Sequence, residues 1–185
     1  MSPSATPSPL LTAAEFMTRY EKHRAELVRG VVKFFPPGGF RHGVICARLC
    51  GIFGNHIDGH DLGHAMSNDT WVWTTADPDS IRCGDLLFYG YDRLPRGRVP
   101  DGIVPTSPDM VIEVRSPSDL WGDLSAKVEE YLGAGVRVVI VLDPTKAAIS
   151  VHRPRQEQSI LQTGDTLTVP DVLPGFAVEV EKLIK

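Results

Sequence analysis

The amino-acid sequence predicts an α/β fold of the mixed (α+β) kind, in which helices pack on a central mixed sheet. Two observations lead to this prediction. Residues 109–142 show the order strand, helix, strand, which is a βαβ-like unit. The segments on both sides contain short apolar runs that end at turn residues, which is typical of antiparallel hairpins. A parallel unit set among hairpins gives a mixed sheet.

The N-terminal elements precede this sheet. Residues 1–10, MSPSATPSPL, are rich in Pro and Ser, so we expect a disordered lead-in and a single domain over 11–185. Thr12, followed three residues later by Glu15, is a capping-box pattern and predicts a short helix from Thr12. The runs AELVRG and VVKFFP then predict a hairpin, so the domain should begin with a helix and a hairpin.

The middle of the chain predicts a longer helix and several strands. The helix should run from about Arg41 to Ile57, because apolar residues recur there at helical spacing. Three strand-like stretches follow, GHAMS, TWVWTT and IRCGDLLFYG, and a turn-rich loop leads to the strand MVIEV. A second helix should run from about Asp119 to Ala134.

The C-terminal third returns to strands. GVRVVIVLD is a near-continuous apolar run, so we expect a strand that is covered on both faces. AAISVHR and SILQTG predict a further hairpin. LPGFAVEVEKLI should close the chain as a short strand or helix, within a C-terminal β-extension of the sheet.

Composition limits the classes of protein that the chain can belong to. No apolar run approaches the roughly 18 residues that a membrane span needs. The three cysteines are an odd number in a chain that is long enough to build a core, which favours a reduced, cytoplasmic protein. The net charge of −4 gives no global electrostatic case for binding nucleic acid. A local basic groove or a bound metal cation can still attract phosphate in an acidic protein.

Two charged residues stand where the pattern asks for apolar ones. Glu113 interrupts the strand MVIEV, and carboxylates are rarely buried without a partner. In the following helix Lys127 falls at the centre of the apolar stripe, between Leu124 and Tyr131. We therefore expect Lys127 and Glu113 to face each other. At this point the pair is open to two interpretations, a salt bridge with no further role or part of a site.

Asp85 favours the second interpretation. It lies in IRCGDLLFYG, which is again an apolar and aromatic strand. If that strand is a neighbour of MVIEV, the carboxylates of Asp85 and Glu113 come close and need a proton or a cation between them. Carboxylate oxygens suit Mg²⁺ or Mn²⁺. Asp, Glu and Lys around a divalent ion are typical of metal-dependent phosphodiesterases.

The segments RCGDLLFY, SPDMVIEVRSPSD, DLSAKVEEYLGAGVRVVIVLDP and DVLPGF resemble the Uma-two family of restriction-endonuclease-like proteins, within the PD-(D/E)XK nuclease superfamily. The resemblance runs from about Tyr20 to the end and is most specific over 107–144. It implies a restriction-endonuclease-like fold and Mg²⁺-dependent (or Mn²⁺-dependent) endonuclease activity, with DNA as the expected substrate. It places the metal ligands on Asp85, Glu113 and the backbone carbonyl of Val114, and the catalytic lysine on Lys127.

The resemblance also has departures and secondary positions. Arg115 stands where the superfamily pattern has its lysine, and Gly84 stands where the family usually has proline. Glu26 matches a further acidic position of the family. His42 matches a position near the start of a helix, where it could touch substrate or cap the helix. Asp109 shares the side-chain parity of Glu113 but lies ~13 Å away along the strand, so it should anchor the strand or sit at the edge of the site.

Two other groups of possible ligands have simpler interpretations. His42, Cys46 and Cys50 share one helical face, but a single straight helix cannot wrap four ligands around zinc. Core packing is therefore the prediction for the two cysteines. The three histidines of HIDGHDLGH are interrupted by glycines, so we expect a polar turn with exposed histidines.

Partners and alternative functions follow from the same residues. Arg96 and Arg98 lie in the loop between the two proposed metal-binding strands, and solvated loop charge is the first interpretation of them. If the metal site exists, this loop hangs over it and could hold phosphates of a bound strand. A homodimer would suit an enzyme that cuts two strands. The alternative function is a non-catalytic scaffold that keeps the charged residues as a folded core. A weaker one is hydrolysis of a small phosphorylated ligand.

Overall fold

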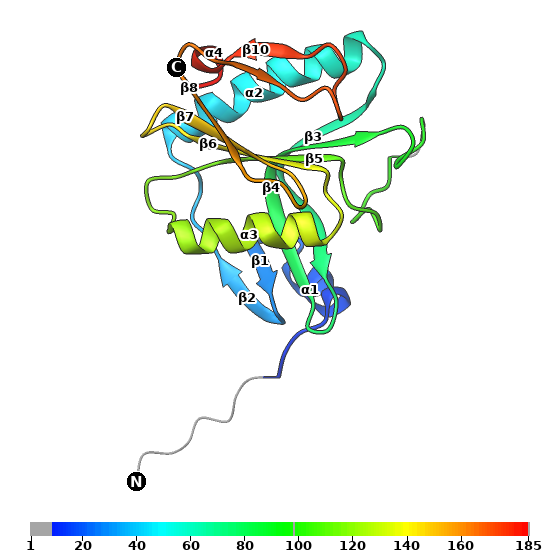
Figure 1. The fold of residues 1–185 in the computed structure, drawn as a ribbon. Coiled ribbons are helices and arrows are strands. Elements are labelled where there is room, and N and C mark those ends of the chain that lie inside the picture. Colours follow the sequence, from blue (N-terminus) through cyan, green and yellow to red (C-terminus); the bar gives the residue numbers. More distant parts are fainter. Residues whose placement is uncertain (1–8, 98, 185) are drawn as a thin grey trace.

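The structure, a computed structural model, describes residues 9–97 and 99–184, so most of the predicted lead-in lies outside the described residues. Its centre is an eight-stranded sheet in the order β2-β1-β4-β5-β6-β7-β8, with β3 paired to β4 (Figure 1). β9 and β10 form a separate two-stranded sheet. The elements are α1 Ala13–Tyr20, β1 Ala25–Val28, β2 Val31–Phe34, α2 Phe40–Gly59, β3 Gly63–Thr75, β4 Ser80–Gly90, β5 Met110–Val114, α3 Trp121–Gly133, β6 Val138–Asp143, β7 Ala148–His152, β8 Ser159–Gln162, β9 Thr166–Thr168, β10 Ala177–Glu179 and α4 Val180–Ile184.

The strand directions confirm a mixed sheet. β5 and β6 are parallel and are connected by α3, while β4–β5, β6–β7 and β7–β8 are antiparallel. The predicted N-terminal hairpin is β1–β2, whose turn residues Arg29 and Gly30 have φ angles of 50° and 76°. Two consecutive positive φ angles are typical of the type I′ hairpin turn.

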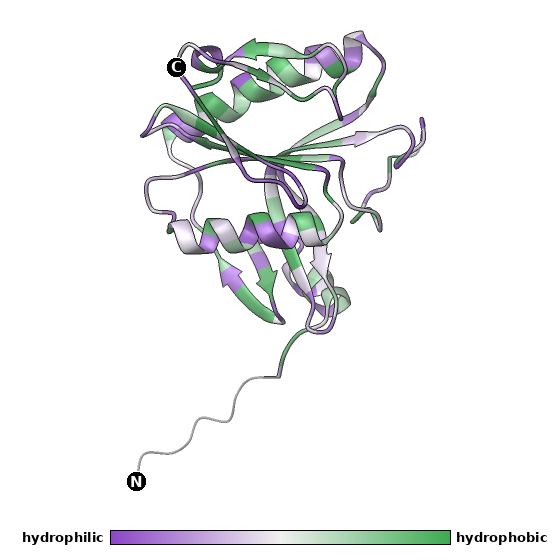
Figure 2. Cartoon of the chain, viewed as in Figure 1, coloured by the Kyte–Doolittle hydropathy of each residue, from purple (hydrophilic) through white to green (hydrophobic). Residues whose placement is uncertain are grey.

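Helices cover both faces of the sheet. α2 lies on one face together with α4 and the β9–β10 sheet, and α3 lies on the other (Figure 1). Adjacent residues of the central strands therefore point to different cores: Ile112 faces the α2 side and Val111 the α3 side. Glu113 shares the parity of Val111, so it points toward α3. Figure 2 shows hydrophobic residues along the central strands and a mixed, partly hydrophilic surface on α3.

Some element predictions were wrong in detail. GHAMS and TWVWTT belong to one strand, β3, whose register shifts at Asn68 and Asp69, where φ is positive. The bulge conceals the continuity of the strand because it breaks the alternation of side chains. α2 continues through Gly59, so His56 lies in the helix and its ring packs 4.2 Å from that of His60, instead of lying in a polar turn. Among the described residues, no helix is long and apolar enough to cross a bilayer.

Candidate functional site

A buried cluster of charged side chains lies between α3 and the middle strands. The Lys127 ammonium is 3.0 Å from Glu113 Oε2 and 3.0 Å from Glu26 Oε1, and it donates to the Cys83 carbonyl at 2.6 Å. One helical turn later, the Tyr131 hydroxyl donates to Glu113 Oε1 at 2.9 Å. Three acceptors surround the three ammonium protons. The structure thus brings Lys127 and Glu113 together, and Glu26 joins them.

A second buried cation, Arg82, connects this cluster to α3. Its guanidinium donates two hydrogen bonds of 2.7 Å to the two oxygens of Glu130 and a third, of 3.0 Å, to Glu26 Oε2. The backbone N–H of Cys83 donates to the other oxygen of Glu26 at 2.9 Å. Glu26 is therefore held by two cations and a backbone donor, which keeps its carboxylate in place. Although burial acts in the opposite direction, Lys127, the Cys83 N–H and Arg82 hold the pKa of Glu26 below its usual value.

Asp85 lies beside this cluster, at the point where β4 and β5 separate. The ladder between them pairs only residues 86–88 with 110–112. Beyond it, Asp85 Oδ2 accepts the backbone N–H of Val114 at 2.7 Å, and Asp85 Oδ1 lies 3.4 Å from His42 Nε2. The side chain of Asp85 is only 11% exposed. No direct contact joins Asp85 to Lys127 among the described atoms. Burial acts to raise the pKa of Asp85, but the hydrogen bonds with His42 and the Val114 N–H, helped by the charges of His42 and Lys127, hold it below its ordinary value.

The glycine at the usual proline position fits this local packing. A Cβ on Gly84 would lie 2.4 Å from Leu87 Cδ2 and 3.2 Å from Val111 Cγ1, so these side chains occupy the space that another residue would need. Asp85 nevertheless reaches the Val114 N–H. The departure at Gly84 leaves the carboxylate in the site.

The cluster carries more negative than fixed positive charge. Glu26, Asp85, Glu113 and Glu130 are four carboxylates, whereas Arg82 and Lys127 are two cations, which leaves a formal charge of −2 when all are ionised. Burial, helped by the charges of Asp85 and Glu26 and opposed by Lys127, raises the pKa of Glu113 to about 8. Despite its burial, the charges of Glu113 and Glu26 raise the pKa of Lys127 above its ordinary value. A buried excess of this kind needs protons or a cation.

His42 provides part of that balance. Its hydrogen bond to Asp85 raises its pKa, burial opposes the shift, and the backbone carbonyl of Val114 adds to it. His42 therefore faces both Asp85 and Val114, two of the groups that the sequence proposed as metal ligands. The structure places His42, which the sequence expected either to touch substrate or to cap the helix, beside Asp85.

Asp109 and Arg115 lie outside the cluster. Asp109 accepts from the Gly90 N–H at 2.8 Å and pairs with Arg93 at 3.0 Å, so it anchors the loop before β5, as the strand-anchor interpretation expects. Arg115 pairs with Asp143 at 3.5 Å and not with Glu113.

Arg96 lies on an exposed loop and contacts none of the metal-ligand candidates among the described residues. It pairs with Asp61 and lies over the ring of Tyr91 at 4.4 Å. Tyr91 follows the end of β4, about six residues or ~20 Å along the chain from Asp85. Arg98 lies outside the described residues. A different part of the same loop, 101–103, lines a groove that reaches the site, as described below.

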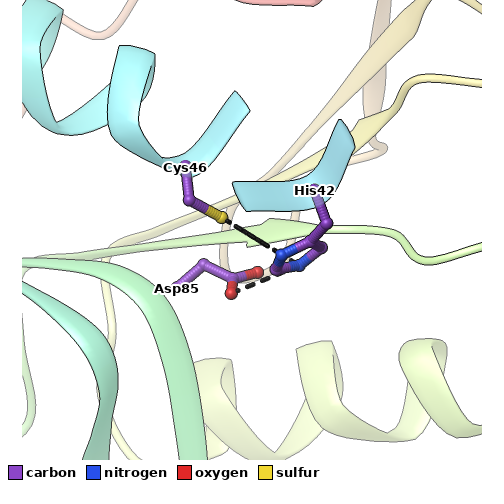
Figure 3. Close-up of side chains that lie close together, drawn as sticks. All are labelled: His42, Cys46 and Asp85. Atoms are coloured by element: carbon purple, nitrogen blue, oxygen red, sulfur yellow. Dashed lines mark hydrogen bonds and ion pairs between the residues drawn. The ribbon is translucent and has the colours of Figure 1, made fainter. Parts of the chain in front are cut away.

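Cys46 lies on α2 one turn after His42. Its sulfur is 3.5 Å from His42 Nδ1, and ligand atoms of His42, Cys46 and Asp85 all lie within 4.8 Å of one another (Figure 3). Burial, followed by the charge of Asp85, raises the pKa of the Cys46 thiol far above its ordinary value. Cys46 and Cys50 both pack against the α2-side core, in agreement with the sequence prediction. Cys46 additionally faces the site.

A surface of cations around an aromatic ring adjoins the site at the C-terminal ends of β5 and β6. Arg115 Cζ and Lys146 Nζ lie 4.8 and 5.0 Å from the centre of the half-exposed Trp121 ring. Arg41 donates to the carbonyl of Pro144, in the turn that carries Lys146. We call Arg41, Arg115, Trp121 and Lys146 the Trp121 surface. Arg115 directly follows Val114 and Arg41 directly precedes His42, so this surface borders the metal-ligand candidates.

A groove of about 680 Å³ reaches Cys83, a residue of the cluster. Its lining comes from the α1–β1 connection, the end of β2, the bulged part of β3, β4 and the loop before β5, and includes Arg24, Phe35, Asp69, Trp71, Cys83 and Ile103. Cys83 belongs to both the groove and the cluster, since its backbone binds Lys127 and Glu26. Arg24 pairs with Asp69 at 2.6 Å inside the groove. The groove therefore meets the cluster at Cys83, and Asp85, Glu113 and Lys127 are not among its lining residues.

Sequence reasoning missed Arg82, Glu130 and Tyr131. Arg82 was recognisable, because it is a second charge in the same apolar strand as Asp85. Tyr131 was assigned to the apolar stripe, and its hydroxyl gives no periodic signal. Glu130 contacts Arg82 only because β4 packs against α3 in the fold. No local pattern could have shown that contact.

Comparisons with known proteins identify the fold and the family of the chain. A family model described as "Uma2: Putative restriction endonuclease" matches residues 13–181. A protein of Synechocystis sp. described as "Uncharacterized protein slr1290" is 27% identical over 186 residues, which cover 97% of this chain and 94% of that protein. The crystal structure of a "putative nuclease belonging to DUF820" from Anabaena variabilis has a TM-score of 0.82 at 19% identity and covers 94% of this chain and 97% of that one. With the fold shared and the family model matched along nearly the whole chain, this protein belongs to the Uma2 family.

Proposed function

We propose that this chain is a Mg²⁺- or Mn²⁺-dependent endonuclease that hydrolyses phosphodiester bonds in DNA. The observation that carries the proposal is the buried excess of carboxylates at Asp85 and Glu113, beside Lys127. A folded core gains little from such an excess, since burying charge costs several kcal/mol per ion when it is not balanced. Family membership supports the nuclease class, and the site suggests how the chemistry could be done.

The residues fit a hard divalent cation. The Asp85 carboxylate, the Glu113 carboxylate and the Val114 carbonyl offer only oxygen atoms, which Mg²⁺ prefers. The Asp85 carboxylate already lies 3.4 Å from His42, and this contact raises the pKa of the imidazole. When all four carboxylates are ionised, the cluster's formal charge of −2 matches a single divalent ion, which would take the place of the proton that Glu113 otherwise keeps. When bound, this ion would acidify a water molecule and neutralise charge on a phosphate oxygen.

The remaining residues of the cluster position these ligands. Lys127 holds Glu113 and Glu26 at 3.0 Å each and adds a positive charge close to the place where a phosphate would react. Its three protons are engaged, so Lys127 acts here by fixing carboxylates and not by holding a free water. Tyr131 fixes the second oxygen of Glu113. Arg82 fixes Glu26 by donating a hydrogen bond to its Oε2 atom.

The Trp121 surface supports a nucleic-acid substrate. Its exposed cations, Arg41 and Lys146, can contact phosphates, and its aromatic ring offers a face on which a base can stack. It takes the role that the sequence had suggested for Arg96, and it compensates locally for the net charge of the whole chain, −4.

The test is cleavage of supercoiled plasmid and of labelled duplex by the purified protein with Mg²⁺, Mn²⁺ or EDTA. Glu113→Gln and Asp85→Asn are the site variants, and Asp109→Asn is a matched control because this carboxylate is buried but lies outside the cluster. We expect metal-dependent cleavage that both site variants lose and the control retains. Equal cleavage by Glu113→Gln would show that the proposal is wrong.

One feature favours the alternative, a non-catalytic scaffold. Every ammonium proton of Lys127 is already satisfied within the protein, so the cluster can hold together without a ligand. In that case the folded protein would neither cleave nucleic acid nor bind divalent ions, and a chelator would not change its binding to protein partners.

A further inference from the structure

Cys46 gives the site a ligand that Mg²⁺ chemistry does not use. Its sulfur and the His42 ring lie side by side on α2, and Asp85 faces the same ring from β4 (Figure 3). A carboxylate, an imidazole and a thiol together are the donor set of zinc sites, whereas Mg²⁺ takes oxygen. The sequence argument against zinc required all ligands to come from one helix, and Asp85 removes that objection.

The distances suit a tetrahedral ion. With metal–ligand bonds of about 2.0–2.3 Å, ligand atoms around zinc lie roughly 3.3–3.6 Å apart. His42 Nε2 is 3.4 Å from Asp85 Oδ1 and 4.0 Å from Cys46 Sγ. All three ligand atoms lie within 4.8 Å of one another, so small side-chain rotations would close the set. The i, i+4 spacing of His42 and Cys46 fixes two of the ligands on one rigid helix face.

We propose that His42, Cys46 and Asp85 form a binding site for Zn²⁺, and that Zn²⁺ bound there inhibits the nuclease. The inhibitory part rests on the proposed function, because it requires Asp85 to serve the Mg²⁺ site. Zn²⁺ engages Asp85 on the α2 side and thereby withdraws it from Glu113. Binding forms a zinc–sulfur bond, and the Cys46 thiol releases its proton to solvent without any change in oxidation state.

The binding test uses Co²⁺ as a spectroscopic substitute for Zn²⁺ on the full chain. Co²⁺ should give thiolate-to-cobalt charge-transfer absorption, which stoichiometric Zn²⁺ abolishes. Cys46→Ser should lose this absorption and bind Zn²⁺ more than about 100-fold more weakly, since even outer-shell partners of a metal cost 10–100-fold. Cys50→Ser is the matched control, one turn farther along α2, and should behave as the native protein. Charge-transfer absorption that survives in Cys46→Ser, or none in the native chain, would overturn the proposed site.

The inhibition test is separate. Mg²⁺-dependent cleavage is measured with increasing Zn²⁺, and each variant is compared with its own zinc-free rate. Cys46→Ser should need more than about 10-fold more Zn²⁺ for half inhibition than the native chain or Cys50→Ser. Equal sensitivity of all three would refute inhibition through this site. If no variant cleaves in Mg²⁺, the proposed nuclease function fails, whereas the cobalt spectra still decide whether the zinc site exists.

Discussion

Replacing Lys127 with methionine tests the buried cluster most sharply. Methionine keeps the length and apolar stem of lysine but removes the charge that lies 3.0 Å from both Glu26 and Glu113. It also leaves the Cys83 carbonyl without its donor. Breaking a buried pair by removing one partner costs about 3–5 kcal/mol. For a chain of this size that lowers the melting temperature by about 6–20 °C.

The control for this variant is Lys182→Met. Lys182 forms an ion pair of similar length with Glu179, 3.1 Å, but both side chains are more than half exposed. An exposed pair contributes about 0.2–1 kcal/mol, so this variant should melt close to the native protein. Thermal and urea unfolding followed by circular dichroism measure both effects at neutral pH. If Lys127→Met costs no more than Lys182→Met, Lys127 is solvated and the cluster described here does not exist.

Three further predictions concern the same region. In EDTA, the native protein should lose stability, on the order of a few kcal/mol, as pH rises from 4.5 through about 8, because over this window folded Glu113 keeps a proton that the unfolded chain has lost. Urea unfolding at a series of pH values measures this loss, and Glu113→Gln should not show it. Parallel pH profiles of the two proteins would contradict the raised pKa of Glu113. Arg82→Met should lower the free energy of unfolding by about 3–5 kcal/mol in the same assay, because it removes the cation paired with Glu130 and with Oε2 of Glu26. A decrease below about 1 kcal/mol would rule out this network of ion pairs. Trp121→Ala should weaken nucleic-acid binding by about 1–3 kcal/mol in fluorescence anisotropy, whereas the similarly exposed Trp73→Ala should not, and equal effects would argue against stacking on the Trp121 surface.

Sequence periodicity predicted most of the fold because the elements obey their local rules. The capping box at Thr12 starts α1, and the apolar run of β6 is buried along its whole length. Failures occurred where tertiary contacts override the local pattern. The bulge at Asn68 and Asp69 divides β3 in sequence but not in space. Gly59 fits the end of α2 without breaking it.

The site was predicted in its chemistry more than in its geometry. A charge in an apolar pattern is visible in one sequence, and this signal pointed to Glu113 and Lys127. Which charges meet depends on strand order and on where a ladder ends, and those are long-range properties. Asp85 therefore contacts Val114 and His42 directly and has no direct contact with Lys127 among the described atoms. Glu26 belongs to β1, which pairs with β4 on the side away from β5, and it contacts Lys127.

We infer that the negatively charged buried cluster binds a divalent cation. Calorimetric titration of the metal-free protein with Mn²⁺ measures this directly, independently of any substrate. We expect one ion per chain in the native protein and in Asp109→Asn, and loss of binding in both Asp85→Asn and Glu113→Gln. No binding by folded native protein, or equal binding by all four proteins, would contradict the account, and Glu113 would then have Lys127 and Tyr131 as its partners among residues 9–97 and 99–184.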